Sequence, residues 1–164
     1  MIRDPETALY PEVASWLIRH LRGRHPRATV HAQDTHSMDL STFLRRQNIH
    51  SQFKDYDAYE IQVDVTGIVQ STDGIRLAFV ECKVGPITLR DVGQLLGYSL
   101  VARPEWSYLL SPAGASDRLN TLLVTFGRQD ILNYSKGHAI RLASWNVGRK
   151  EVDLSSLIPR GSHI

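Results

Sequence analysis

Apolar and polar residues alternate most clearly in the middle of the chain. Positions 59–65 alternate strictly, which is the pattern of a strand with one face buried. Positions 75–84 are mostly apolar until Glu81 and Lys83, which is typical of a strand covered on both faces. The sequence Ser-Thr-Asp-Gly at 71–74 favours a tight turn between the two runs. We therefore predict a β-hairpin.

The position of the turn fixes which residues of the hairpin face each other. Counting outward from it, Asp64 faces Glu81, and Gln62 faces Lys83. Facing residues of an antiparallel pair point to the same side of the sheet, so two carboxylates and an ammonium group are expected to converge. Burying two unpaired carboxylates is costly. A bound divalent cation is the simplest way to offset this cost, because proteins hold Mg²⁺ beside phosphates with one or two carboxylates.

The remaining periodicity predicts a three-layer α/β sandwich around a central mixed sheet. Helices are expected at 6–22, 88–102 and 116–128, and strands at 28–33, 105–110, 131–134 and 139–147. The unit from 75 to 110 is expected to be a right-handed parallel crossover. The second helix should begin with a capping box of Thr88 and Asp91. The buried stripe of this helix is expected to include Leu89 and Leu100. The buried stripe of the third helix is expected to include Phe126.

Two segments are expected to lie outside the core. Residues 34–57 are polar with one short helix at 40–47, and we interpret them as an arm or insertion. Residues 158–164 resemble a protease-site scar with a tag remnant, so we leave them out of the functional argument. The single predicted domain is therefore 1–157.

Composition narrows the function classes without choosing one. The 164 residues carry a net charge of +2, which is weakly basic and does not by itself indicate nucleic-acid binding. One cysteine, Cys82, excludes an internal disulfide and any cysteine-rich metal centre. The apolar runs are too short for a membrane span and the N-terminus is too polar for a signal peptide, so we expect a cytoplasmic protein with no membrane partner. Neither a histidine pair with zinc spacing nor a Walker loop is present.

The motif Asp64, then Glu81-Cys82-Lys83, then Gln94-x-x-x-Tyr98 on the next helix resembles the PD-(D/E)XK nuclease superfamily. The Gln-x-x-x-Tyr element resembles the RecB-like branch, while the glycine after Glu-Cys-Lys and the Val-Gly-Gln helix resemble Mrr-type restriction domains. The resemblance covers about residues 6–111 and implies a restriction-endonuclease-like αβββαβ core. Position 63 is valine where the family signature has proline.

The resemblance implies a metal site on the hairpin. Asp64 and Glu81 would hold Mg²⁺ or Mn²⁺, and the main-chain carbonyl of Cys82 would complete the coordination. Lys83 would orient or help deprotonate the attacking water and stabilise the charged transition state. A glutamate from the first helix joins the site in many members of the family, and Glu12 is our candidate.

Other residues have roles that the sequence leaves open. Gln94 and Tyr98 would contact the substrate or steady the metal shell, as the resemblance implies, or simply face water. Basic Arg45 and Arg46 could touch phosphates, although an ordinary surface arm explains them equally well. Cys82 points away from Glu81 and is expected to be a core thiol.

Two functions follow from this interpretation. The first is a Mg²⁺- or Mn²⁺-dependent deoxyribonuclease in DNA repair, recombination or defence, with RNA as an open alternative substrate. The second is a non-catalytic nucleic-acid-binding or scaffold module on the same fold, within a larger complex. A homodimer would suit the first function, since it would pair two sites for two strands.

Overall fold

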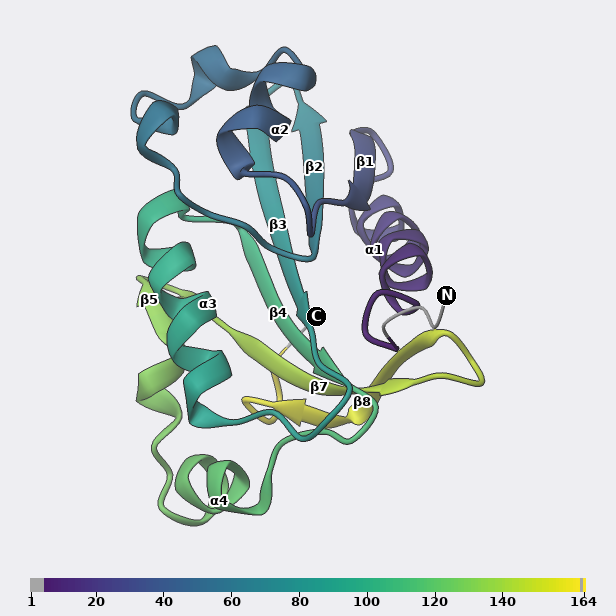
Figure 1. The fold of residues 1–164 in the computed structure, drawn as a ribbon, viewed down its shortest axis with the longest axis vertical. Coiled ribbons are helices and arrows are strands. Elements are labelled where there is room, and N and C mark those ends of the chain that lie inside the picture. Colours follow the sequence, from purple (N-terminus) through teal and green to yellow (C-terminus); the bar gives the residue numbers. More distant parts are fainter. Residues whose placement is uncertain (1–4, 163) are drawn as a thin grey trace.

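A computed structural model describes residues 5–162 and 164, which form an α/β fold around a six-stranded mixed sheet (Figure 1). The four α-helices in that part of the chain are α1 (Tyr10–Arg24), α2 (Leu40–Arg46), α3 (Leu89–Ala102) and α4 (Asp117–Asn120). The sheet strands are β1 (Thr29–Asp34), β2 (Val65–Ser71), β3 (Gly74–Cys82), β4 (Trp106–Ser111), β7 (Arg141–Asn146) and β8 (Glu151–Ile158). β5 (Asn133–Ser135) and β6 (His138–Ala139) form a separate ribbon. Short 3₁₀ turns lie at His50–Gln52, Tyr56–Ala58 and Gln129–Leu132, and a π turn at Thr121–Thr125.

The strand order is β1-β2-β3-β4-β7-β8. β1, β2 and β3 pair in antiparallel fashion, β3, β4 and β7 are parallel, and β8 returns antiparallel to β7. The chain passes from β3 through α3 to β4, so the predicted parallel crossover is confirmed in its strand direction. None of the described helices is both long and apolar enough to cross a bilayer.

Two separate apolar cores lie on the two faces of the sheet. On one face, α1 packs through Val13, Trp16 and Leu17 against β1–β4, β7 and β8. On the other face, α2, α3 and α4 cover side chains such as Phe79 and Leu109. Figure 1 shows α1 alone on one side of the sheet and α3 on the opposite side, which gives the layered arrangement. The strands between the two cores are buried on both faces, as their nearly continuous apolar sequence predicts.

α1 rests closely on a row of small residues in the sheet. Ala32, Gly67 and Ala78 are neighbours across β1, β2 and β3. A methyl group added at Gly67 would lie 2.9 Å from Cδ2 of Leu17, closer than such atoms pack. Glycine is therefore needed here to let the helix approach the strand.

The hairpin has the predicted turn and register but a shorter first strand. Gln70 pairs with Ile75, and β2 begins only at Val65. Residues 59–64 alternate as a strand does because Tyr59, Ile61 and Val63 enter the second core. Their backbone bonds elsewhere, for example from Leu40 N–H to the Ile61 carbonyl at 2.7 Å.

One predicted pair is therefore wrong. Gln62 does not face Lys83, since its side-chain amide donates to the main-chain carbonyl of His36. The segment that carries Gln62 has left the β3 ladder and bonds instead to the loop before α2.

Residues 34–57 are not excluded from the core. Leu40, Phe43 and Leu44 of α2 are buried in the second core cluster. A helix with only a few apolar residues can bury all of them when it lies flat on a sheet, which the polar composition of the segment concealed.

The chain end also belongs to the sheet in the described residues. Ile158 pairs with Leu142, and Leu157, Ile158 and Ile164 are buried. Ile158 and Ile164 therefore pack with the rest of the fold within the segment 158–164, which we expected to be a tail, and His163 lies outside the described residues. The alternating run 151–158 forms β8, a strand that was not predicted from the sequence.

The two later helices differ from expectation in their exposed faces. The predicted capping box of Thr88 and Asp91 is present at the start of α3. Leu89 and Leu100, however, are 54% and 52% exposed rather than buried. α4 is short and continues into a π turn, which leaves Phe126 70% exposed. The change from α to π geometry rotates Phe126 off the buried stripe.

Candidate active site

The candidate site lies where β2 begins and β3 ends, at the open end of the hairpin. Asp64 immediately precedes β2, Glu81 lies near the end of β3, and Lys83 directly follows that strand. The Lys83 N–H donates to the Leu110 carbonyl at 2.8 Å, which extends the β3–β4 pairing past the last strand residue. The backbone around the predicted motif is thus held by two neighbouring strands.

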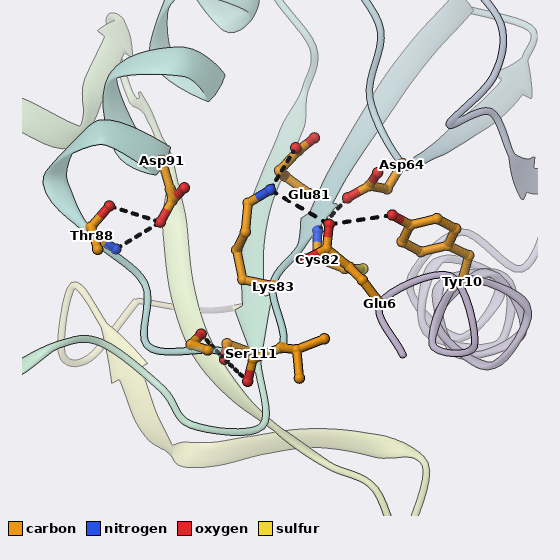
Figure 2. Close-up of polar contacts among 11 residues, drawn as sticks. Glu6, Tyr10, Asp64, Glu81, Cys82, Lys83, Thr88, Asp91 and Ser111 are labelled. Atoms are coloured by element: carbon orange, nitrogen blue, oxygen red, sulfur yellow. Dashed lines mark hydrogen bonds and ion pairs between the residues drawn. The ribbon is translucent and has the colours of Figure 1, made fainter. Parts of the chain in front are cut away.

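The structure brings the three central residues of the motif together (Figure 2). The Cys82 N–H donates to Oδ2 of Asp64 at 2.7 Å, so the Asp64 carboxylate reaches across to β3. Lys83 Nζ lies 3.3 Å from Oε1 of Glu81. Asp64 and Glu81 are only 8% and 6% exposed. The two carboxylates therefore do not lie on a solvated face of the sheet.

Glu81 is incompletely satisfied by its surroundings. Its Oε2 atom is buried and has no hydrogen-bond partner among the described residues. Burial, reinforced by the charge of Asp64, raises the pKa of Glu81 to about 7. Burial also raises the pKa of Asp64, against the opposing hydrogen bond from Cys82. Two carboxyl groups share one end of the hairpin without enough positive charge to keep both ionised easily.

Lys83 is the positive group that faces this pair. Burial works against its charged form, but the carboxylates of Glu81, Glu6 and Asp64 outweigh that effect and raise the pKa of Lys83. Its ammonium therefore stays charged, 3.3 Å from Glu81 and 3.7 Å from Oε1 of Glu6. A charged group in this position can stabilise an anion bound beside the carboxylates.

Two residues near the first helix complete the site, and neither was predicted from the sequence. Glu6 precedes α1 and approaches Lys83, and Tyr10 in the first turn of α1 donates to Oε1 of Glu6 at 3.4 Å. Burial and the nearby charges of Asp64 and Glu6 raise the pKa of Tyr10. The signal that could have found them is their spacing of four residues, which aligns polar groups at a helix start.

Glu12, the expected glutamate from the first helix, is engaged elsewhere. Its Oε1 lies 2.9 Å from Lys150 Nζ in the β7–β8 turn. The acidic residue that approaches Lys83 from this part of the chain is Glu6 instead. Position along the helix decides this, because Glu12 lies two residues after Tyr10 and side chains two apart in a helix differ in direction by about 200°.

Among the described residues, no hydrogen bond or ion pair joins the remaining predicted residues to the acidic pair. Gln94 is exposed and Tyr98 packs partly against the second core, and neither makes a side-chain hydrogen bond to another described residue. Arg45 pairs with Asp57 and lies over the ring of Tyr56. The neighbouring Arg46 is exposed.

The donor set suits a cation that is only partly bound by protein. Asp64, Glu81 and the Cys82 carbonyl offer oxygen ligands, and the unpartnered Oε2 of Glu81 has a free acceptor site. No cluster of three or more acidic, histidine or cysteine side chains arranged for a metal occurs in the described part of the chain. Mg²⁺ accepts such a site, because it commonly keeps several waters and takes one or two carboxylates. The residues present therefore fit a Mg²⁺- or Mn²⁺-type ion and not a fully enclosed metal centre.

Comparisons with known proteins add no assignment. The chain matches no protein-family model, no curated protein and no solved structure. The functional argument therefore depends on the residues and their geometry.

Proposed function

We propose that this protein is a metal-dependent nuclease that hydrolyses phosphodiester bonds in DNA. The observation that supports this most strongly is the buried pair of Asp64 and Glu81, with an unpartnered Glu81 oxygen and Lys83 Nζ at 3.3 Å. Buried carboxylates without matching positive charge are costly, and a divalent cation beside a phosphate would offset that cost.

The order of elements is consistent with a restriction-endonuclease-like core. α1, β1, β2, β3, α3 and β4 follow one another as αβββαβ when residues 35–64, which contain α2, are counted as an insertion. The motif residues lie at the ends of the second and third of these strands. We propose this core as the fold of the first two-thirds of the chain.

Each residue has a definite role in this proposal. Asp64 and Glu81, with the Cys82 carbonyl, would hold the cation. The bound ion would polarise a phosphoryl oxygen and lower the pKa of a bound water. Lys83 would place its ammonium against the negative charge that develops on the phosphate. Tyr10 would keep Glu6 in place beside Lys83 through its hydrogen bond.

Cleavage of DNA in the presence of Mg²⁺ or Mn²⁺ tests the proposal directly. We expect the purified protein to cut single-stranded, duplex, flapped or four-way DNA, or RNA, in a metal-dependent manner. Lys83→Met should lower the rate by about 10²–10³-fold, because it removes the charge that stabilises the transition state.

Lys136→Met is the matched control, since Lys136 is an exposed lysine in the β5–β6 turn. It should cleave as the wild type does. A wild-type protein that cuts none of these substrates with either ion would overturn the proposal, and so would equal rates for the two lysine variants.

A non-catalytic module is the second candidate, and two observations favour it. The described residues contain no three-ligand metal cluster, and Lys83 is already engaged by Glu81 and Glu6. Titration with Mn²⁺ separates the two functions. A nuclease must bind Mn²⁺ in a way that Asp64→Asn weakens, whereas a scaffold has no need to bind it there.

A further inference from the structure

An apolar groove lies between the start of α3 and the α4 segment. It has a volume of about 720 Å³, and Leu89, Leu122 and Phe126 supply its apolar lining. Leu89 and Phe126 are more than half exposed, at 54% and 70%. An aromatic ring that is displayed to this extent in a concave surface indicates a binding site rather than a packing position.

The groove also carries uncompensated positive charge. Arg90 and Arg118 line it, both are exposed, and neither forms an ion pair with another described residue. Arg128, by contrast, is paired with Asp130 at 2.8 Å. Asp117 also lines the groove, so the two arginines leave a net positive charge there. Such a rim complements an anionic ligand.

Backbone bonds fix the groove to the same end of the sheet as the candidate active site. Ile87 N–H donates to the Gly114 carbonyl, and Ser116 N–H donates to the Ile87 carbonyl, each at 2.8 Å. The Ser111 hydroxyl donates to the Gly85 carbonyl at 2.7 Å. The segment between Lys83 and α3 is thus tied to the segment between β4 and α4.

One residue of the groove, Thr88, is drawn together with the candidate active site. Figure 2 shows Thr88, which lines the groove, on one side of Lys83 and Asp64 on the other. A polymer lying in the groove would therefore extend toward Lys83.

We propose that this groove binds the single-stranded part of a nucleic-acid substrate, with Phe126 stacking on a base and Arg90 and Arg118 contacting phosphates. A single strand offers both flat apolar bases and a regular series of negative charges, which matches the lining and the rim. A duplex keeps its bases stacked inside and offers no base face to Phe126. This inference rests on the proposed function, because it names the strand that the candidate active site would cut.

Binding measured without divalent cations tests the inference apart from cleavage. Fluorescence anisotropy in EDTA would follow labelled oligo-dT and oligo-U strands of roughly 12 nucleotides, and a matched duplex. We expect the single strands to bind more tightly than the duplex. Phe126→Ala should weaken single-strand binding about tenfold, because it removes the ring on which one base would stack. Phe126→Trp should preserve it.

The arginines are tested by the salt dependence of the same binding. Arg90→Ala combined with Arg118→Ala should weaken binding and reduce the slope of log affinity against log salt by about 0.7 for each phosphate that is no longer neutralised. Leu154→Ala and Arg27→Ala are matched controls, because Leu154 is 67% exposed and Arg27 is exposed, both outside the groove. Neither control should change binding.

Several outcomes would overturn the inference. The first is unchanged affinity in both the Phe126→Ala and the double arginine variants, and the second is equal affinity for duplex and single strand. The third is a change only in self-association, which would make the groove an interface between copies or with another protein. The proposed function fails separately. Single-strand binding through Phe126 without any metal-dependent cleavage would refute the nuclease and leave the binding groove standing.

Discussion

The two ends of the β2–β3 hairpin treat their acidic residues in opposite ways. At the turn, Asp73 is exposed, and its N–H donates to the Ser71 hydroxyl. At the open end, Asp64 and Glu81 are buried and have raised pKa values. The same hairpin therefore carries a solvated acid at one end and a buried acidic pair at the other.

This difference separates what the fold requires from what a ligand would require. A hairpin needs no carboxylates at its open end, and well-packed apolar residues there would be equally or more stable. The acidic pair lowers stability unless a positive ligand joins it. The contrast supports a cation at the open end and gives an internal control at the turn.

The largest expected difference is between two variants, each of which neutralises one acid at one end of the hairpin. Under the proposed function, Asp64→Asn should lower metal-dependent cleavage about 10³-fold, or about 4 kcal/mol of transition-state stabilisation, because it weakens the ion site. Asp73→Asn should leave cleavage unchanged. Initial rates for the two variants under identical conditions measure this, and similar losses in both would remove the functional distinction between the two ends.

A smaller effect is expected in the pH dependence of stability. The pKa of Glu81 is about 7 in the folded protein, above an ordinary value near 4.5, so the folded state holds more protons between these pH values. The free energy of unfolding, measured without divalent cations, should therefore fall by about 1–3 kcal/mol as pH rises from 4.5 to 7.

Glu81→Gln tests the source of that slope. The variant cannot ionise at this position, so its stability should change less with pH over the same range. Mg²⁺ or Mn²⁺ should also restore wild-type stability at pH 7, since an ion that binds only the folded state stabilises it. Chemical denaturation at several pH values measures both effects. A slope that persists in Glu81→Gln would assign it to other groups.

The smallest effect concerns the turn end alone. Gly74 has a φ of +124°, and a methyl group there would meet nothing within 4 Å. Gly74→Ala should therefore lower the free energy of unfolding by about 1 kcal/mol through backbone strain. It should leave metal binding unchanged. Thermal unfolding and Mn²⁺ titration together check this, and weakened Mn²⁺ binding would show that the two ends are not independent.

Local patterns in the sequence predicted the centre of this molecule well. The turn fixed the register that pairs Val65 with Val80 and so brings Asp64 and Glu81 to the same end of the hairpin, because hairpin pairing depends on a few adjacent residues. The Thr88–Asp91 capping box is likewise a short-range arrangement. Features of this kind depend on neighbours along the chain and can be found without a structure.

Features that depend on distant contacts were not predictable in the same way. Residues 59–64 alternate like a strand, yet their backbone bonds to the loop before α2. Glu6 reaches Lys83, and Glu12 pairs with Lys150, through the placement of α1 against the rest of the fold. Ile158 pairs with Leu142 in β8, although the sequence after Ile158 resembles a tail. In each case a partner far along the chain decides the outcome.

The missing side chain at Gly67 has a consequence far from its own position. Leu17 rests on that glycine, and Tyr10 lies about two turns earlier on the same helix. A bulkier residue at position 67 would displace α1 away from the sheet. Tyr10 and Glu6 would then draw back from Asp64 and Lys83, so the shape of the acidic site depends on one absent methyl group beneath the middle of α1.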